Sequence, residues 1–387
     1  MKYTFLSRKV SALLTFGIFF AVSCSTLTQS SKPPHELYHE GNYDQALEQV
    51  NRTLADDPQR EDLQLLKVSI LTAQAKNLPQ PERRTLPYRN AYDTKNLQIH
   101  EPALSDSAHS LLLSAWSFEQ DAALTILQQE SRLSDQQYRL AKSHLENALT
   151  VLPDSSAPYS LLSTLSYRQG ETDQALLYLQ QAVENDAHVT EAMLEKQAYL
   201  YMETGNLERS AELYEQLVDQ FGTTDTYTHG LLNAYILQER HEKAIELLSE
   251  LRESHPTRPF YLEALAVQSY YQSRREFEQD NDIDSFAADL ARISDMFEEL
   301  MAMTPFYEER THRAATFYSN ATRQLLEHGR DSFADKAAQF AASSVQHWQQ
   351  LMENDPENRA YAVQLARAYR AAGMTNEAEL LEQQYNL

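Results

Sequence analysis

The sequence of 387 residues is poor in the residues that bend or cross-link a compact domain, with 8 glycines and 1 cysteine. A single cysteine excludes an intramolecular disulfide. No segment alternates polar and apolar residues between hairpin turns, which argues against a β-sheet. Alanine, leucine, glutamate and glutamine are abundant, and all four favour helix. We therefore expect an all-α protein with almost no strand.

Motifs that carry chemistry are also scarce, since the chain has no phosphate-binding glycine loop and no Gly-x-Ser-x-Gly motif. His35–His39 (HELYH) matches the H-E-x-x-H zinc string, but it opens the first expected helix with no catalytic domain around it. Asp280–Asp284 begins like a calcium loop, but Ser285 and Ala291 stand where that loop needs Gly and Glu. We therefore predict no enzyme activity, no cofactor and no metal site. An enzyme built on the His35–His39 string is the weakest alternative.

Positive charge is in deficit, with 33 Lys and Arg against 56 Asp and Glu, a net charge of −23. Nucleic-acid binding depends on Lys and Arg that neutralise phosphates, so we predict no nucleic-acid partner. The same acidity argues against the body of the protein lying on anionic lipid. The acidic composition is consistent with the solubility of a protein that has an extended surface. A basic protein partner remains an alternative.

A helix-pair pattern returns every 34 or 35 residues. A bulky apolar residue recurs at Leu145, Leu179, Tyr214 and Leu248, in steps of 34, 35 and 34. Four positions before each of them stands a small residue: Ala141, Ala175, Ser210 and Ala244. A fixed period of this length marks a unit that cannot bury its apolar face alone and stacks on copies of itself. The sequence therefore predicts an array of helix pairs in place of one central core.

Turn and stop residues complete the pattern. Five residues before the small residue, several units have a glycine: Gly41, Gly170, Gly205 and Gly373. Several units end at a proline: Pro58, Pro153, Pro256, Pro305 and Pro356. This spacing resembles the tetratricopeptide repeat (TPR), in which small residues let the second helix of a pair approach the first. The resemblance covers roughly 36–76 and 105–387, and implies an all-α, right-handed superhelical solenoid of about seven to eight antiparallel helix pairs.

The N-terminus carries a second signal. Lys2, Arg8 and Lys9 precede a short apolar run at Val10–Val22, which is too short to span a bilayer as a helix. Cys24, the only cysteine, follows that run closely, and this arrangement resembles the bacterial lipoprotein signal, in which the cysteine is lipidated. A plain secretory signal and a membrane-spanning anchor are the alternatives. The resemblance implies a lipid anchor at the bacterial cell envelope, at the outer membrane and facing the periplasm or the cell surface.

These signals divide the chain into consecutive segments. They are a signal peptide (1–23), a flexible lipid-anchored tether (24–35), N-terminal TPR-like helices (36–76), a Pro-rich linker or loop (77–104), a TPR array (105–256), divergent TPR-like helices (257–356) and a C-terminal TPR-like unit (357–387). We expect residues 77–104 to be disordered, or to be held against the neighbouring helices, rather than to form a binding loop. Tyr88 and Tyr92 are the aromatic residues that such a loop would offer.

In the resemblance, the ligand lies in a groove lined by the first helix of each unit, at its positions 2, 5, 9, 12 and 13. In this chain the resemblance assigns those positions to Ser160, Thr164, Tyr167, Arg168, Glu195, Tyr199, Met202, Glu203, His229, Asn233, Ile236 and Leu237. Chaperone-binding members hold a C-terminal carboxylate with Lys and Asn at positions 5 and 9, and only Asn233 matches. The mixture of aromatic, aliphatic and acidic groups instead suits an amphipathic peptide or helix. Alternatively, residues such as Tyr167 and Tyr199 pack between adjacent helices.

We therefore predict a lipid-anchored adaptor or assembly scaffold. It binds another protein or peptide through this groove, and the membrane through lipidated Cys24. It resembles the assembly-accessory lipoproteins of outer-membrane and pilus machines, which implies a role in the assembly of an outer-membrane or secretion machine. The alternative is a solute- or glycan-binding lipoprotein that partners an outer-membrane transporter, a class that carries long aromatic-bearing loops.

Overall fold

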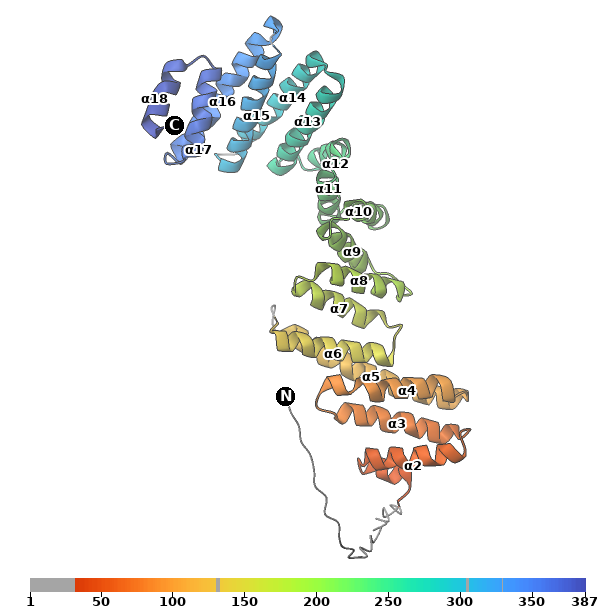
Figure 1. The fold of residues 1–387 in the computed structure, drawn as a ribbon. Helices are drawn as coiled ribbons and strands as arrows, with labels where there is room; N and C mark the ends of the chain where they lie inside the picture. Colours follow the sequence, from red (N-terminus) through yellow and green to blue (C-terminus); the bar gives the residue numbers. More distant parts are fainter. Residues whose placement is uncertain (1–31, 130–132, 304–305, 329) are drawn as a thin grey trace, which may run out of the picture. The chain divides into compact units, whose positions relative to one another are not determined.

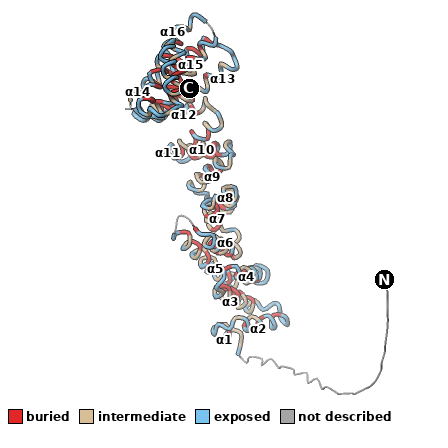
Figure 2. Tube along the Cα trace, turned by 60° about the vertical axis from the view of Figure 1, so that its left-hand side comes forward, coloured by how far each residue is buried: buried red, intermediate tan, exposed pale blue. Residues whose placement is uncertain are grey.

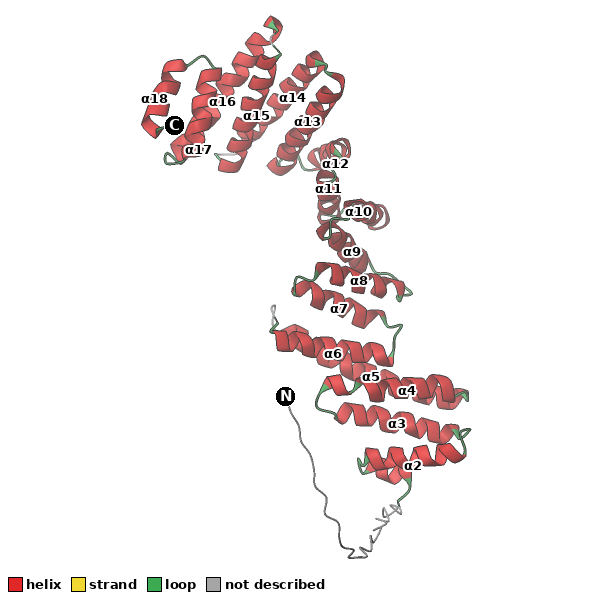
Figure 3. Cartoon of the chain, in the orientation of Figure 1, coloured by secondary structure: helices red, strands yellow, loops and turns green. Residues whose placement is uncertain are grey.

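The computed structural model describes residues 32–129, 133–303, 306–328 and 330–387. These residues form eighteen α-helices and two short 3-10 helices, and they contain no β-strand (Figure 3). The predicted fold class, an all-α TPR-like solenoid of antiparallel helix pairs, is confirmed. No helix in the described ranges is both long and apolar enough to cross a membrane. Cys24, the predicted signal peptide and most of the predicted tether lie outside the described residues.

The chain divides into two compact units, Met1–Asp154 and Ser155–Leu387. The first unit consists of three helix pairs: α1 (Pro34–His39) with α2 (Tyr43–Asp56), α3 (Glu61–Asn77) with α4 (Thr85–Gln98), and α5 (Pro102–Gln129) with α6 (Asp135–Val151) (Figure 1). A 3-10 helix, η1 (Pro81–Arg83), precedes α4.

The second unit consists of six helix pairs. They are α7 (Ser156–Arg168) with α8 (Thr172–Glu184), α9 (Glu191–Glu203) with α10 (Leu207–Phe221), α11 (Asp225–Leu237) with α12 (His241–Ser254), α13 (Pro259–Asp280) with α14 (Ile283–Met303), α15 (Glu308–Glu327) with α16 (Ala334–Asn354), and α17 (Arg359–Ala371) with α18 (Thr375–Tyr385). A 3-10 helix, η2 (Asp331–Phe333), precedes α16. The described residues thus hold nine pairs, more than the seven to eight expected.

The repeating residues form the buried seam of the second helix in each pair. The bulky anchors are at most 4% exposed: Leu145, Leu179, Tyr214 and Leu248. The small residues before them are all 0% exposed: Ala141, Ala175, Ser210 and Ala244. Figure 2 shows this burial as short buried stretches that recur along the helices. A small side chain at each of these positions lets two helices pack closely, so the predicted register is confirmed from α6 to α12.

The turn inside a pair requires a left-handed backbone. Gly170 and Gly205 have φ of +80° in the α7–α8 and α9–α10 turns. Without a Cβ, glycine adopts this conformation at little cost. In the α11–α12 turn the corresponding residue is Glu239, with φ of +56°. A residue other than glycine costs about 1–2 kcal/mol there, so Glu239 keeps the same turn at a local cost in stability, and this repeat lacks the glycine signal.

The predicted Pro-rich linker or loop at 77–104 is wrong, because η1, α4 and the start of α5 occupy most of it. Pro87 lies in the first turn of α4 and Pro102 is the first residue of α5. At these places a helix does not need the N–H that proline lacks. Tyr88 is buried, and Tyr92 is half-buried against the same apolar cluster, so neither belongs to a binding loop. Helix α4 completes a pair with α3, which adds a repeat that the prolines concealed.

A buried polar network joins α4 to α5 and α6. Glu119 on α5 is 0% exposed and accepts hydrogen bonds from Arg84 Nη1 at 3.1 Å and the Tyr88 hydroxyl at 2.8 Å. Its second oxygen lies 2.6 Å from His144 Nδ1. Burial, followed by the Glu119 carboxylate, raises the pKa of Tyr88. A carboxylate without water needs such partners, so these side chains hold the three helices in one arrangement.

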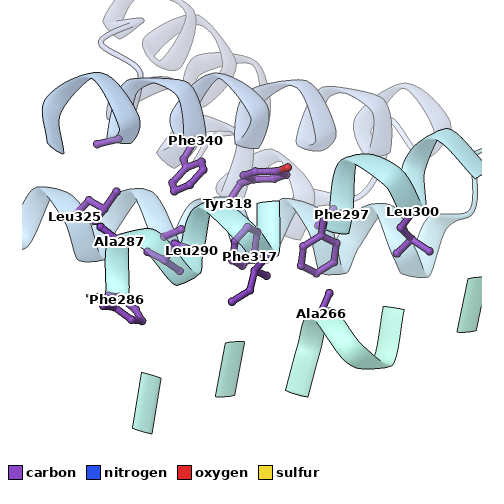
Figure 4. Packing of buried hydrophobic residues seen from close by; sticks show 14 of the residues in the cluster. Ala266, Phe286, Ala287, Leu290, Phe297, Leu300, Phe317, Tyr318, Leu325 and Phe340 are labelled. Atoms are coloured by element: carbon purple, nitrogen blue, oxygen red, sulfur yellow. The ribbon is translucent and has the colours of Figure 1, made fainter. Parts of the chain in front are cut away.

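The divergent segment 257–356 has longer helices than the regular repeats. Helices α13 to α16 have 22, 21, 20 and 21 residues, whereas α7, α8 and α9 have 13 each. Their shared core is rich in aromatic side chains, and the rings of Phe297 and Phe317 stack with centroids 5.0 Å apart (Figure 4). Longer helices lengthen the repeat, which is why the 34-residue step fails in this segment.

Candidate functional site

The first helices of the pairs in the second unit, α7, α9, α11, α13, α15 and α17, contact one another in succession. We call the surface that they present the groove face. Lys196 Nζ on α9 donates to Thr164 Oγ1 on α7 at 2.7 Å. His229 Nε2 on α11 lies 3.1 Å from the Tyr261 hydroxyl on α13, and the Tyr361 hydroxyl on α17 donates to Glu308 on α15 at 2.8 Å. Side chains thus connect neighbouring repeats across this face.

Two tyrosines form the most exposed aromatic contact between α7 and α9. The hydroxyl groups of Tyr167 and Tyr199 are 2.9 Å apart, and their rings meet edge to face with centroids 5.9 Å apart. The two residues are 39% and 38% exposed. The hydrogen bond to Tyr167, then burial and the hydrogen bond to the Glu203 carboxylate, raise the pKa of Tyr199. This arrangement offers a partner two aromatic rings beside a carboxylate.

Lys196 lies on the same helix as Tyr199 and was not among the predicted groove residues. Burial, followed by repulsion from the Arg168 guanidinium, lowers the pKa of Lys196 to about 8. Its position next to Glu195 on a groove helix is the signal that could have identified it. The α7–α9 part of the groove face therefore holds a cation that loses its proton more easily than a free lysine.

The other predicted groove residues lie in different surroundings. Glu195 is half-buried, and after burial its carboxylate is the second cause that raises the pKa of Tyr214 to about 12. Met202 packs half-buried against the core of α9 to α13. His229 lies edge-on to Phe260 with ring centroids 6.0 Å apart, whereas Asn233 is exposed. The structure thus brings Tyr167, Tyr199 and Glu203 together, while His229 engages α13.

Two pockets lie on the part of the groove face where the sequence predicted no site. One, of about 230 Å³, lies between α13 and α15 and is lined by residues that include Tyr271, His312 and Asn320. The other, of about 560 Å³, lies between α15, α16 and α17 and also includes Asn320. Because the repeat step fails in 257–356, the groove positions of α13 and α15 could not be assigned from the sequence.

The two metal-like strings occupy ordinary structural positions. His35 and His39 are exposed on α1, a helix of 6 residues. Asp282 Oδ1 accepts hydrogen bonds from the backbone N–H groups of Asp284 and Ser285 at 3.1 and 3.2 Å, at the start of α14. Within the described residues, no group of three or more His, Cys, Asp or Glu side chains is arranged to hold a metal ion.

A tetratricopeptide repeat model matches residues 195–259, which run from α9 into the first residue of α13. The match covers most of α9 and all of α10, α11 and α12. The TPR segment contains most of the predicted groove residues, namely Glu195, Tyr199, Met202, Glu203, His229 and Asn233. No curated protein matches the sequence.

Solved structures resemble the chain at low sequence identity. The structure of Naa15/Naa10 bound to HypK-THB is 14% identical with a TM-score of 0.33, and the match covers 91% of this chain and 62% of that chain. The C-terminal part of a TPR repeat-containing protein from Cytophaga hutchinsonii is 14% identical with a TM-score of 0.38, covering 86% and 98%. Pseudomonas aeruginosa pilF is 14% identical with a TM-score of 0.35, covering 65% and 96%.

Proposed function

We propose that this protein is a lipid-anchored TPR adaptor of a bacterial envelope membrane, which captures an amphipathic segment of a partner protein on the α7–α9–α11 part of the groove face. The observation that carries the proposal is the pair formed by Tyr167 and Tyr199. Both rings are more than one-third exposed, and their hydroxyl groups are already hydrogen-bonded to each other across two repeats. Rigid aromatic side chains of this kind supply much of the energy in protein interfaces.

The charges around the pair define the chemistry of the partner. Glu203 hydrogen-bonds Tyr199, and Glu195 lies one helical turn before Tyr199 on the same helix. A ring face attracts a cation, and the two carboxylates attract a basic flank. Met202 supplies adaptable apolar contact. The segment that fits is therefore amphipathic, with Lys or Arg beside its apolar face.

The membrane part of the proposal depends on the N-terminal residues. Cys24 follows a short apolar run and is the only cysteine of the chain. A lipid on Cys24, joined to the first helix by a polar tether, would hold the repeats at the membrane surface. Such an adaptor would serve the assembly of an outer-membrane or secretion machine. The glycan-binding alternative has less support, because Tyr88 and Tyr92 are in a packed helix.

A site-specific photocrosslinker in living cells of the source bacterium tests the proposed groove. Asn233 is exposed on α11 of the groove face, and Leu177 is 55% exposed on α8, a second helix. A benzophenone amino acid at position 233 should give a discrete protein adduct, and the same group at position 177 should not. Adducts of equal yield at both positions, or at neither, would contradict groove binding.

A further inference from the structure

The pocket between α15, α16 and α17 is hollow because its floor is made of small side chains. Ala341, Ser344 and Ala368 are buried and form this floor, whereas Ala371, also small, is exposed at the rim. Leu326 stands at its wall and is 52% exposed. With about 560 Å³ available, the pocket accepts a branched aliphatic side chain on an apolar floor.

Helix α17 has three arginines and no acidic residue, in a chain with a net charge of −23. Two of the three hold α18. Arg370 Nη2 lies 2.7 Å from Glu382, and Arg359 donates to the backbone carbonyl of Asn386. The third, Arg367, lines the pocket and forms no salt bridge with any residue that the structure describes. Its charge is therefore available to a ligand.

A second guanidinium stands on the opposite wall. Arg323 on α15 lies 3.2 Å from Glu327, and both side chains are about 60% exposed, at 60% and 58%. A solvent-exposed salt bridge of this kind contributes little to stability, so the carboxylate of a ligand can replace Glu327 as the partner of Arg323. Asn320 and Gln364 add amide groups to the same walls. The rim of this pocket thus carries two cations and one carboxylate, although the chain as a whole is acidic.

We propose that this pocket docks a partner segment in which an aliphatic side chain stands next to side-chain carboxylates. The aliphatic group rests on the floor of small residues, and a carboxylate pairs with Arg367, whose planar guanidinium can make two parallel hydrogen bonds. This charge preference is opposite to that of Glu195 and Glu203 at α7–α9. The groove face would therefore hold two segments of opposite charge, so that each site would select a different partner. The inference does not depend on the α7–α9 site.

Selection from a display library of random dodecapeptides tests it. The peptides are joined to their carrier through the C-terminus, so that only side chains supply carboxylates. The baits are the full mature chain with Cys24→Ser, and the same chain with Arg367→Glu, Arg367→Gln or Ala371→Leu. Arg292→Glu is the matched control, because Arg292 on α14 has 75% of its side chain exposed and lies outside the pocket lining. Circular dichroism confirms that each bait is folded.

On the unaltered bait, peptides with Asp or Glu beside Leu, Ile or Val should be enriched. Their recovery should fall at least about tenfold with Arg367→Glu, less with Arg367→Gln, and stay unchanged with Arg292→Glu. Ala371→Leu should also lower their recovery, since the larger side chain at the rim narrows the entrance of the pocket. The inference is overturned if acidic peptides are not enriched, or if the Arg367 and Ala371 variants retain them. A Tyr199→Ala bait separates the two sites, because it should lose basic peptides and keep acidic ones.

Discussion

The side-chain hydroxyl groups of Tyr167 and Tyr199 lie 2.9 Å apart and join the first helices of two successive repeats. Each residue is more than one-third exposed, so the pair does not belong to the buried core, although its two side chains are held in place by their mutual hydrogen bond. Two interpretations follow: the rings anchor a partner, or they stabilise the stacking of α7 on α9. The two interpretations predict different results from the same variant.

Tyr199→Ala should weaken partner binding by about 2 kcal/mol or more, because truncating an aromatic anchor in an interface typically costs that much. The melting temperature should change little, since the ring is 38% exposed. Tyr199→Phe keeps the ring and should retain most of the affinity. Binding and thermal unfolding are measured on the same preparations. A melting temperature lowered by several degrees would favour the stacking interpretation.

Lys196 should titrate with a midpoint of about 8, observable in the NMR signals next to its amino group as the pH is varied. Arg168→Gln should raise that midpoint, because it removes a neighbouring positive charge. The lowered pKa of Lys196 also makes the stability of the fold depend on pH. Between about pH 8 and 10 the unfolded chain keeps a proton that the folded chain has lost, so the contribution of Lys196 to stability rises with pH. An unchanged midpoint in the Arg168 variant would contradict this assignment.

Glu119→Gln should destabilise the first unit by about 3–5 kcal/mol, because it leaves Arg84 buried without its anionic partner. The two tryptophans of the chain report the units separately, Trp116 on α5 and Trp348 on α16. Urea unfolding, followed by fluorescence in single-tryptophan variants, should show the larger loss of stability at Trp116. Glu48→Gln is the control, since the Glu48–Arg52 pair is more than half exposed and contributes less than about 1 kcal/mol. Equal losses of stability for Glu119→Gln and Glu48→Gln would show that the buried network adds nothing to the stability of the first unit.

Ala175→Leu should destabilise the second unit by about 1–3 kcal/mol through overpacking. Ala175 is 0% exposed and packs in a cluster with Leu179, Ala182 and Leu200. Leu177→Ala, two positions along the same helix, should change stability little because Leu177 is 55% exposed. Circular dichroism during urea unfolding measures both variants. If the two lose the same stability, the predicted packing of α8 is incorrect.

Cys24→Ser should move the protein from the membrane fraction to the soluble fraction. The reason is that a lipidated cysteine supplies the hydrophobic attachment, whereas serine cannot accept the lipid. Fractionation in low and high salt, with mass spectrometry of the mature N-terminus, measures the effect. A Cys24→Ser protein that stays membrane-bound in high salt would exclude this anchor.

The repeat was predictable because it depends on local spacing. Ala175 and Leu179 lie one turn apart on one helical face, so their burial follows from the period of the helix. The turn at Gly205 follows from the backbone freedom of glycine, with φ of +80°. Prolines misled the prediction at 77–104, because proline tolerates the first turn of a helix as well as a loop. Only the position of Pro87 relative to the start of α4 separates those two cases.

The sequence by itself determined the fold class and the identity of the seam residues from α6 to α12. Tertiary structure alone decided which of these side chains meet. Glu119 contacts Arg84 and His144, which are 35 and 25 residues away, and Tyr167 meets Tyr199 across 32 residues. Such contacts depend on the rotation and spacing of packed helices, which vary with every side chain between them. The spacing that predicts a helix pair therefore cannot show that Arg367 is the one arginine of α17 free to face the pocket.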